Sequence, residues 1–484
     1  MYVSVSSGLA IRNDHYCSYL VRIDRVPDNP PLNKGVLVIP SFMGLIFSLL
    51  GTIPYDDNIK LIHDKTGLSE KAIRSFLDQL IENPESQSIN IGSGITIVFP
   101  PFMLRKYDSP HHPHTFQVPD FNWKHEFNIH RPSIPLSVNL MVTTKCTTDC
   151  QYCYANRGLK SLLTTDELIR IVKDLKRKGV VNLSLTGGDI FALKGWQRLI
   201  DEVMKIGYNP FLSTKTPLPE SDISLLRNLG CTELQFSLDS CDPTVLKELI
   251  HADDDYLIRF TEMMDACCKY GIKVLTRTVL TSLNSDLDDI KKLYGFFTKF
   301  PCITEWSLTP AFLSEYKEEN YLKLEPRNED LEKLYPFLTS SDLKITVVLN
   351  RLDEQGYKLQ RCDTVEDFVT HNTICVANST VISILANGQC SVCEMLYEHP
   401  EFILGDIRTD SIDNIWNSQK ALDLYVAHQL QTDAKSPCHT CKVFSECKQS
   451  FGKRVCYMDI MKSGLPIDGP DPRCPKSPET DKIL

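Results

Sequence analysis

The chain has 484 residues, of which 42% are hydrophobic and 24% charged, and its formal net charge at pH 7 is −10. This length predicts two to four domains, and the composition is that of an ordinary globular protein. A nucleic-acid surface needs clustered Lys and Arg, so the negative balance argues against one. The sequence has no apolar run long enough to cross a membrane and no secretory signal at its start. We therefore predict a cytoplasmic protein.

The cysteines are the unusual part of the composition. There are 18 of them, with three in 146–153 and nine in 362–474. A cytoplasmic protein keeps its thiols reduced, so these clusters do not predict disulfides, and metal binding explains them better. The remaining six fit as small buried hydrophobic residues; they are Cys17, Cys231, Cys241, Cys267, Cys268 and Cys302.

Residues 1–106 form the first predicted domain. The patterns predict strands at 16–23 and 35–39, a helix at 41–50, helices at 59–66 and 69–83 around the turn Gly67-Leu68, and two strands within 88–99 around the turn at 92–94. A helix-turn-helix followed by a β-hairpin is a winged helix-turn-helix. DNA binding is the obvious function of that fold, but residues 56–85 hold four basic and seven acidic residues. That is the wrong sign for contact with phosphates.

Residues 107–136 are predicted to be a linker. Residues 107–135 contain five histidines and five prolines and show neither a helical nor a strand period. His111, His112 and His114 are of a metal-binding type, but Pro113 among them favours an extended surface segment. We expect no site here.

From residue 137 to about 350, strands alternate with helices. Thr164 and Glu167 form a capping box that begins a helix running to Lys178. Such alternation predicts parallel βαβ units with right-handed crossovers. The strand candidates are 137–144, 181–187, 210–214, 233–239, 273–281, 305–310 and 344–349.

Three cysteines in a C-x3-C-x2-C pattern, Cys146, Cys150 and Cys153, follow the first of these strands. Three thiolates on one loop can hold three irons of a [4Fe–4S] cluster, whose cysteines normally come in fours, and leave the fourth iron for an external ligand. The alternatives are a zinc site, which favours paired ligands, or three unrelated core cysteines.

With Tyr152 before its last cysteine, this loop resembles the signature of the radical S-adenosylmethionine (SAM) enzymes. The resemblance implies that SAM chelates the open iron, and that its reductive cleavage gives a 5′-deoxyadenosyl radical that abstracts hydrogen from the substrate. It also implies a partial (β/α)6 barrel with the chemistry at the carboxyl ends of the strands.

Other strand ends resemble SAM-binding motifs of the same family. Thr186-Gly187-Gly188-Asp189 closes the second strand, with Asp where the family usually has Glu, and its glycines would let backbone approach a ligand. By resemblance, Asp189 would accept from the SAM ammonium, Ser237 or Asp239 would contact other polar groups, and Arg277 would bind the carboxylate. Ser213 ends the third strand, and Tyr152 would pack beside the adenine. Each is alternatively an ordinary polar residue at a strand end. The sequence identifies no catalytic side chain.

The tail carries the second cysteine pattern, Cys375-x12-Gly388-x4-Cys393 and Cys438-x2-Cys441-x5-Cys447, followed by Cys456 and Cys474. It resembles the SPASM extension, which implies two auxiliary [4Fe–4S] clusters. The distal one would take Cys438, Cys441, Cys447 and Cys474, and the nearer one Cys375, Cys393 and Cys456. The family run usually places a cysteine where this chain has Phe451.

Two questions about the tail stay open. Cys390 and Cys393 with Cys438 and Cys441 also have the spacing of a zinc ribbon, which would leave the other tail cysteines unexplained. The fourth position of the nearer cluster would belong to Cys390, to Cys362 or to no residue of the chain.

The predicted fold is thus α/β: a partial radical SAM barrel (137–350) with an N-terminal winged helix-turn-helix domain and a cysteine-rich SPASM extension (351–484). In radical enzymes that modify ribosomal peptides, a similar winged module binds the leader peptide by β-augmentation. The resemblance implies a peptide maturase, an oxidoreductase of ribosomal peptide biosynthesis that attacks an unactivated C–H bond and takes electrons from a donor such as flavodoxin or ferredoxin.

Thioether formation from a cysteine is the preferred reaction. Carbon–carbon or ether crosslinking comes second, and formylglycine-forming sulfatase maturation third. An iron–sulfur DNA-binding redox regulator is the alternative from another class, but such a sensor has no use for Thr186 to Asp189. The peptide, the residues joined, the stereochemistry and the oligomeric state are not specified by the sequence.

Overall fold

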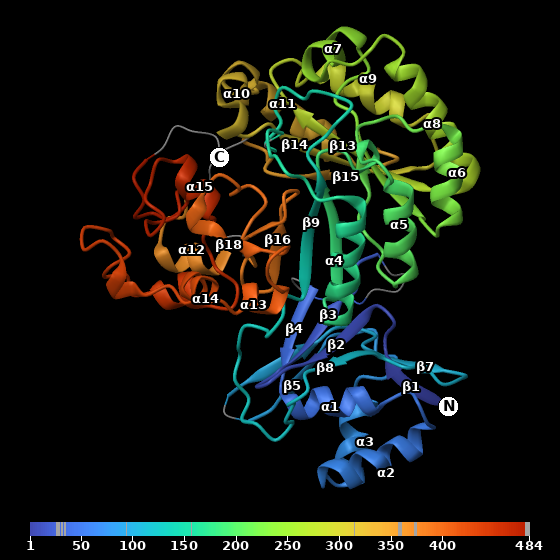
Figure 1. Ribbon diagram of the computed structural model, residues 1–484, viewed down its shortest axis with the longest axis vertical. Coiled ribbons are helices and arrows are strands. Elements are labelled where there is room, and N and C mark those ends of the chain that lie inside the picture. The colour runs from blue at the N-terminus through green and yellow to red at the C-terminus, as the bar shows by residue number, and fades with distance from the viewer. Residues whose placement is uncertain are drawn as a thin grey trace. The chain divides into compact units, whose positions relative to one another are not determined.

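The computed structural model describes residues 1–25, 30, 32, 35–92, 94–155, 157–313, 315–356, 361–371 and 375–479 (Figure 1). The chain divides into two compact units. The first contains Met1–Val138, Lys173–Leu183 and Tyr208–Pro210, and the second contains the remaining residues.

The first unit contains the predicted helix-turn-helix and wing: α1 (Ser41–Leu49), α2 (Tyr55–Thr66), α3 (Glu70–Asp78), β5 (Gln87–Asn90) and β6 (Thr96–Phe99). Helix α2 ends because Gly67 takes a left-handed φ of 74° and donates its N–H to the carbonyl of His63. Ser69 then caps α3 by accepting from the Ala72 N–H at 3.3 Å. Helix α3 ends five residues before the predicted boundary. Residue 93 of the predicted hairpin turn lies outside the described residues.

A four-stranded sheet in the order β4-β3-β2-β8 and a pair β1-β7 complete this unit. Their bounds are β1 Tyr2–Val5, β2 Leu9–Asn13, β3 Ser18–Arg22, β4 Val36–Ile39, β7 Leu104–Tyr107 and β8 His114–Gln117. Strand β8 lies inside the predicted linker and pairs in parallel with β2. The linker prediction was wrong there, because a four-residue strand between prolines has no period of its own and forms only against the edge of β2.

The alternating part of the chain, most of which belongs to the second unit, confirms the seven predicted strands. In chain order it comprises β9 Ser137–Thr143, α4 Thr165–Arg177, β10 Asn182–Gly187, α5 Trp196–Lys205, β11 Ser213–Thr214, α6 Glu220–Asn228, β12 Glu233–Ser237, α7 Pro243–Ile250, α8 Tyr256–Tyr270, β13 Lys273–Leu280, α9 Leu287–Phe297, β14 Ile303–Pro310, α10 Glu318–Leu324, α11 Asn328–Leu338 and β15 Thr346–Leu349. Glu167 accepts from the Thr164 N–H at 2.7 Å and the Thr164 hydroxyl at 2.8 Å, which confirms the capping box.

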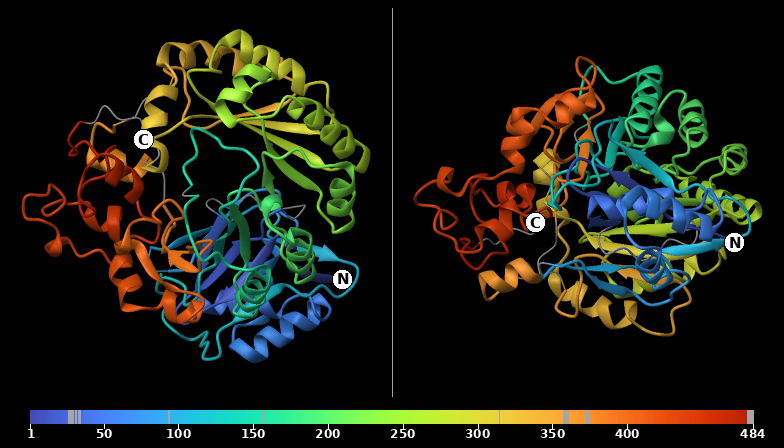
Figure 2. Two further views of the ribbon diagram at one scale, coloured as in Figure 1. Left: turned by 45° about the horizontal axis from the view of Figure 1, so that its top comes forward. Right: turned by 90° about the horizontal axis from the view of Figure 1, so that it is seen from below.

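Strands β11 to β15 form one parallel sheet. Every second residue packs toward the helices that cover one face of this sheet (Figure 2), as Phe236 does on Phe260 and Trp306 on Phe297. The residues between them, such as Gln235 and Arg277, point to the other face. That face therefore carries polar side chains next to apolar ones such as Leu275 and Val279.

The first two barrel strands join the C-terminal extension. Strands β16 (Val381–Ile384), β17 (Gln389–Ser391) and β18 (Ile403–Asp406) extend a sheet in the order β10-β9-β16-β17-β18. Met141 of β9 packs there with Leu385, Ala386 and Tyr397. Among the described strands, no ladder joins β10 to β11, so the barrel strands lie in two sheets. The predicted barrel and extension therefore form one compact unit instead of two.

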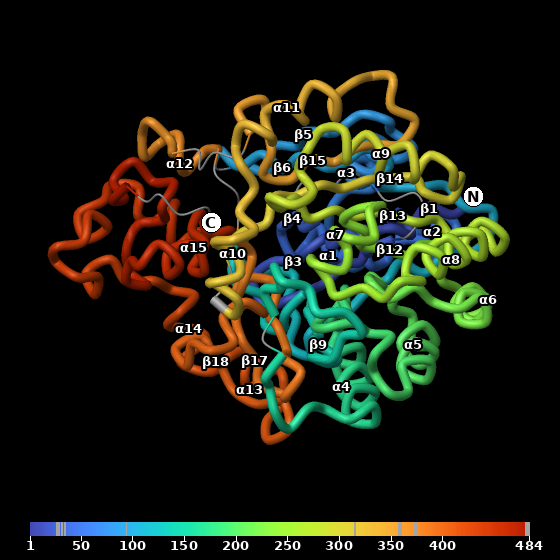
Figure 3. Tube along the Cα trace, turned by 90° about the horizontal axis from the view of Figure 1, so that it is seen from above, coloured from blue at the N-terminus to red at the C-terminus, as the bar shows by residue number. Residues whose placement is uncertain are grey.

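The cysteine-rich end of this unit has little regular structure. Its helices are α12 (Val365–His371), α13 (Ile412–Trp416), α14 (Gln419–Tyr425) and α15 (Tyr457–Lys462). Figure 3 shows this end beside α10 and on the side of the barrel opposite α6. Of the helices that the structure describes, none is long and apolar enough to cross a membrane.

Candidate active site and auxiliary centres

The three-cysteine loop begins three residues after the carboxyl end of β9, where the sequence placed it. Burial raises the pKa of Cys146 to about 12, and the neighbouring sulfurs of Cys150 and Cys153 raise it further. The three thiols are thus close enough to act on one another. Because coordination to a metal deprotonates a thiol, iron would overcome this preference for the protonated form.

Contacts from two helical regions fix this loop. The Asp149 N–H donates to the Ile250 carbonyl at 3.0 Å, and the Gln151 N–H donates to the Leu249 carbonyl at 2.9 Å. The Lys317 amine donates to the Asp149 carboxylate and to the Cys150 carbonyl, both at 2.9 Å. The hydrogen bond from Lys317 is the main cause of the lowered pKa of Asp149. The loop is therefore held in place by the chain itself.

Gly187 and Gly188 allow two backbone segments to approach each other. A Cβ at Gly187, whose φ is 123°, would lie 2.3 Å from the Thr143 carbonyl oxygen, and a Cβ at Gly188 would lie 2.2 Å from that of Lys145. The Gly188 N–H donates to the Thr143 carbonyl at 2.7 Å, and the Asp189 N–H donates to that of Lys145 at 2.8 Å. The end of β10 thus packs on the residues that lead into Cys146, whereas we expected these glycines to admit a ligand.

Asp189 is buried and ties the strand ends together. Its carboxylate accepts from the hydroxyls of Thr214 and Thr216, both at 2.7 Å, from the Lys215 N–H at 3.2 Å and from the Phe191 N–H at 3.0 Å. Donors of the chain therefore already engage the group that we expected to bind the SAM ammonium.

Tyr152 and Asp239 meet in a buried cluster with Lys215, a residue at the end of the third strand to which the sequence assigned no role. The Lys215 amine donates to the Tyr152 hydroxyl and to the Asp239 carboxylate, both at 2.6 Å, and the Tyr152 hydroxyl also donates to Asp239. Burial lowers the pKa of Lys215, but the charge and hydrogen bond of Asp239 together with the sulfurs of Cys150 and Cys153 outweigh it, and the net shift is upward. This charge-neutral cluster locks the middle of the three-cysteine loop to the end of β12.

The remaining predicted SAM residues lie along the face of the sheet that these helices do not cover. Ser213 donates to the Gln235 side chain, which donates to the Ser237 hydroxyl at 2.9 Å. Arg277 is the register partner of Ser237 on β12 and of Ser307 on β14. Its side chain is exposed, and among the described residues it has no hydrogen-bond or ion-pair partner. A guanidinium in this situation is free to bind a carboxylate.

The four predicted distal cysteines line one pocket, together with Phe444, Lys448 and Asp471; they are Cys438, Cys441, Cys447 and Cys474. Burial raises the pKa of Cys447 to about 12, and Cys438 and Cys474 are near enough to raise it further. The structure thus brings together the four residues that the pattern grouped, although Cys474 is 27 positions after Cys447.

The three predicted nearer cysteines also lie together. Burial raises the pKa of Cys393 and of Cys456 to about 12, and in both the Cys375 sulfur adds to the shift. The Cys375 N–H donates to the Lys453 carbonyl at 2.7 Å, in an isolated bridge that brings the two segments together. Cys456 donates its N–H to the Asp471 carboxylate at 2.9 Å.

Neither candidate for the fourth position accompanies these three. Cys390 is fully buried in β17, opposite Ile384 and Gly405, and its nearest charge is Asp406. Cys362 donates its N–H to the Arg473 carbonyl, and the charges that act on its thiol are those of Asp363, Asp367, Asp471 and Arg473.

The zinc ribbon is not formed either. Cys438 and Cys441 share their pocket with Cys447 and Cys474, not with Cys390 and Cys393. In the described part of the chain, no three His, Cys, Asp or Glu side chains converge on a single-ion site, whereas four zinc ligands would lie about 2–2.3 Å from one point.

Glu394 is a residue that sequence reasoning missed. Its carboxylate accepts from the Thr186 hydroxyl at 2.9 Å and from the Tyr154 hydroxyl at 3.3 Å, and burial raises its pKa. Because Tyr154 follows Cys153 and Glu394 follows Cys393, this contact ties the two cysteine loops together. The available signal was an acidic residue directly after a predicted cluster ligand.

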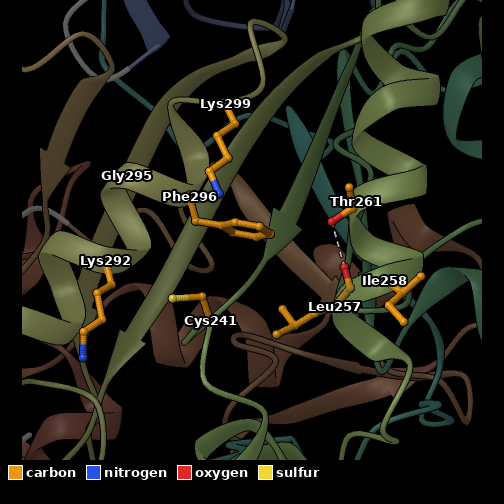
Figure 4. Close-up of a pocket in the computed structure, with 8 residues that line it drawn as sticks. All are labelled: Cys241, Leu257, Ile258, Thr261, Lys292, Gly295, Phe296 and Lys299. Carbon is orange, nitrogen blue, oxygen red and sulfur yellow. Dashed lines mark hydrogen bonds between the residues drawn. The ribbon is translucent and has the colours of Figure 1, made fainter.

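A separate groove lies between α8 and α9 (Figure 4). Leu257, Ile258 and Thr261 line it from α8, and Lys292 and Phe296 line it from α9. It contains none of the predicted site residues. The candidate site is therefore defined by the strand ends and the cysteine groups.

Comparison with known proteins agrees with this geometry. Residues 140–297 match the family model of the Radical SAM superfamily, and residues 375–442 match SPASM, an iron-sulfur cluster-binding domain. Residues 140–297 therefore form a Radical SAM domain and residues 375–442 a SPASM domain, which agrees with the predicted family and fold class.

Two curated relatives match parts of the chain. The sporulation killing factor maturation protein SkfB of Bacillus subtilis is 29% identical over 23% of this chain and 28% of its own length. A GTP 3′,8-cyclase of Rhizobium leguminosarum is 27% identical over 41% of this chain and 59% of its own. The chain thus matches less than two thirds of the length of either relative.

A solved structure matches over nearly the whole chain. Streptococcus suis SuiB bound to S-adenosylmethionine covers 98% of this chain and 100% of its own, with a TM-score of 0.61 and 14% identity. SuiB bound to its precursor peptide SuiA gives a TM-score of 0.62 and 15% identity. At this identity the match establishes the fold, including that of the N-terminal part.

Proposed function

We propose that this protein is a radical SAM peptide maturase that modifies a ribosomally made precursor peptide by hydrogen abstraction. The observation that carries the proposal is the match along 98% of the chain to SuiB, which has been solved with SAM and with its precursor peptide. Partial similarity to a maturation protein, SkfB, supports the same substrate class.

The residues present fit the cofactors that this function needs. Cys146, Cys150 and Cys153 would hold the SAM cluster, and the exposed Arg277 would bind the SAM carboxylate beside Ser237. When bound, this cluster and SAM supply the 5′-deoxyadenosyl radical. The chain itself contributes the fixed loop and the buried Tyr152–Lys215–Asp239 cluster, which keep the reacting centre in one place.

The winged unit is proposed to bind the leader peptide. Its sheet has two edge strands, β4 and β8, that an extended peptide can extend. On α2 and α3 the cations are partly neutralised, since Arg74 pairs with Asp56 at 2.6 Å and Lys60 lies 3.9 Å from Asp57. This surface therefore offers few free positive charges to DNA. Fluorescence anisotropy with labelled leader peptide and with labelled duplex DNA shows which of the two the protein binds.

Thioether formation is the proposed reaction. Cys375, Cys393 and Cys456 lie together without Cys390 or Cys362, which supports a nearer cluster with one position open to a substrate thiol. The chemistry supplied there is removal of the thiol proton. Flavodoxin or ferredoxin is the proposed electron donor.

The test is anaerobic co-incubation with SAM, dithionite and short peptides encoded beside the gene. We expect 5′-deoxyadenosine and a peptide that has lost two hydrogens per crosslink and no longer reacts with iodoacetamide at one cysteine. A crosslinked peptide whose cysteines all remain alkylatable would indicate carbon–carbon or ether crosslinking, and an aldehyde would indicate formylglycine. DNA binding without any peptide modification would contradict the proposal.

A further inference from the structure

Lys448 is a buried cation beside the distal cysteines. It directly follows Cys447, lines the pocket that the four distal cysteines share, and is 3% exposed. Its amine donates to the carbonyl oxygens of Asp468 and Gly469 at 2.9 and 2.6 Å. The Asp468 carboxylate accepts from the Asp433 N–H at 2.9 Å and forms no ion pair with Lys448.

No carboxylate neutralises this cation. Among the described residues, Lys448 forms no ion pair within 4 Å. Arg473, another cation of this region, is by contrast paired with Asp459 and Asp471. Burying an ammonium without a counter-charge is unfavourable, and two carbonyl dipoles do not fully replace one. Asp471, which lines the same pocket, is already paired with Arg473, so Lys448 has no ion-pair partner of its own among the described residues.

The chemistry of the pocket supplies a negative charge. Four cysteine thiolates outweigh the positive charge of a [4Fe–4S] core, so the occupied site is anionic, and one-electron reduction adds one more negative charge. Lys448 lies at this site, because it directly follows Cys447 and its amine binds the carbonyls of Asp468 and Gly469, just before the pocket residues Pro470 and Asp471. A fixed cation in a medium of low dielectric stabilises the reduced form more than the oxidised form.

We propose that Lys448 is the counter-charge of the distal auxiliary cluster and raises its reduction potential. The cluster then accepts an electron more readily, either from the nearer cluster or from an external donor, without any change in its ligands. This inference depends on the four cysteines being cluster ligands and is independent of the identity of the substrate.

The test measures potentials instead of turnover. A parent variant with Cys146, Cys150 and Cys153 replaced by Ala keeps only the auxiliary clusters. The electron paramagnetic resonance signal that disappears when Cys474 is also replaced by Ala is assigned to the distal cluster. We compare Lys448→Met with Lys448→Arg, which keeps the charge. Lys442→Met is the matched control, since Lys442 is an exposed lysine of the same cysteine run. Iron content and redox titration followed by electron paramagnetic resonance are the readouts.

We expect Lys448→Met to lower the distal midpoint potential and leave the nearer one unchanged, with Lys448→Arg and Lys442→Met close to the parent. An unshifted midpoint in Lys448→Met with full iron would overturn the proposal. If Lys448→Met loses the distal cluster while Lys448→Arg keeps it, the charge is required and the proposal stands. Loss in both variants would assign Lys448 to packing, and absence of iron from this pocket in the parent would instead refute the ligand assignment.

Discussion

The two auxiliary cysteine groups differ in how completely the chain encloses them. The distal group brings four cysteines and a buried lysine around one pocket. The nearer group brings three, while Cys390 lies in β17 with Asp406 as its nearest charge. A fully ligated cluster is suited to storing and passing on electrons, whereas one with an open position is suited to binding substrate. With both groups holding clusters, as proposed, the extension would divide these two tasks between them.

Replacing the cysteines of the three-cysteine loop tests whether the two auxiliary cysteine groups bind iron without that loop. Replacing Cys146, Cys150 and Cys153 with Ala is expected to reduce 5′-deoxyadenosine formation to background, because no iron remains to bind SAM. About one third of the iron should be lost if three clusters are present. The measurements are chromatography of the SAM products and iron analysis. Continued 5′-deoxyadenosine formation under dithionite would show that the loop was misassigned.

Single replacements at Cys375 and Cys390 test the open position directly. We expect Cys375→Ala to lose the nearer cluster, because it removes one of three ligands. Cys390→Ala should keep that cluster and cost about 1–2 kcal/mol of unfolding free energy through a small cavity. Iron content and chemical denaturation measure the two effects.

Peptide addition sharpens the same test. In Cys390→Ala, a cysteine-containing precursor should shift the electron paramagnetic resonance spectrum of the nearer cluster, and a Cys-to-Ser precursor should not. Loss of the nearer cluster from Cys390→Ala would mean that this residue is the fourth ligand.

Glu394 connects the nearer cysteine group to the three-cysteine loop. Removing its carboxylate should therefore let the two groups shift relative to each other. Glu394→Ala removes the acceptor for Thr186 and Tyr154, and small displacements of reacting groups cost about 10- to 100-fold in rate. We expect crosslinking to fall by that factor while peptide-independent SAM cleavage and iron content stay at the parent level. Glu401→Ala, at an exposed acid in the same extension, is the control. Equal loss of both activities would indicate general destabilisation.

The smallest expected effect concerns Glu167, which caps α4 and pairs with Arg408 of the extension at 3.0 Å. Hydrogen bonds from the Thr164 backbone and hydroxyl are the main causes that lower the pKa of Glu167 from 4.5 to about 2. Its stabilising contribution is therefore complete above about pH 4.5 and is lost as the pH falls toward 2. We expect Glu167→Gln to cost about 1 kcal/mol at pH 7 and nothing near pH 2, measured by urea unfolding at both values.

Local chemistry made several features predictable from the sequence. Cysteine spacing after an apolar strand indicated the SAM loop, alternating strands and helices indicated the barrel, and Gly67 and Ser69 set the turn of the winged unit. These patterns need only neighbouring residues: a period, a cap, or ligands within one loop. They were enough to predict the family and the fold class.

Other features depend on contacts between distant segments, and only the tertiary structure decided them. Strand β8 forms because β2 offers an edge, and β9 and β10 join the extension because β16 lies beside them. Asp189 binds Thr214 and Thr216, Lys215 reaches Tyr152, and Glu394 reaches Thr186, although none of these pairs shares a motif. Short strands and buried polar side chains take their partners from whatever folding brings near, and one sequence read alone does not contain that proximity.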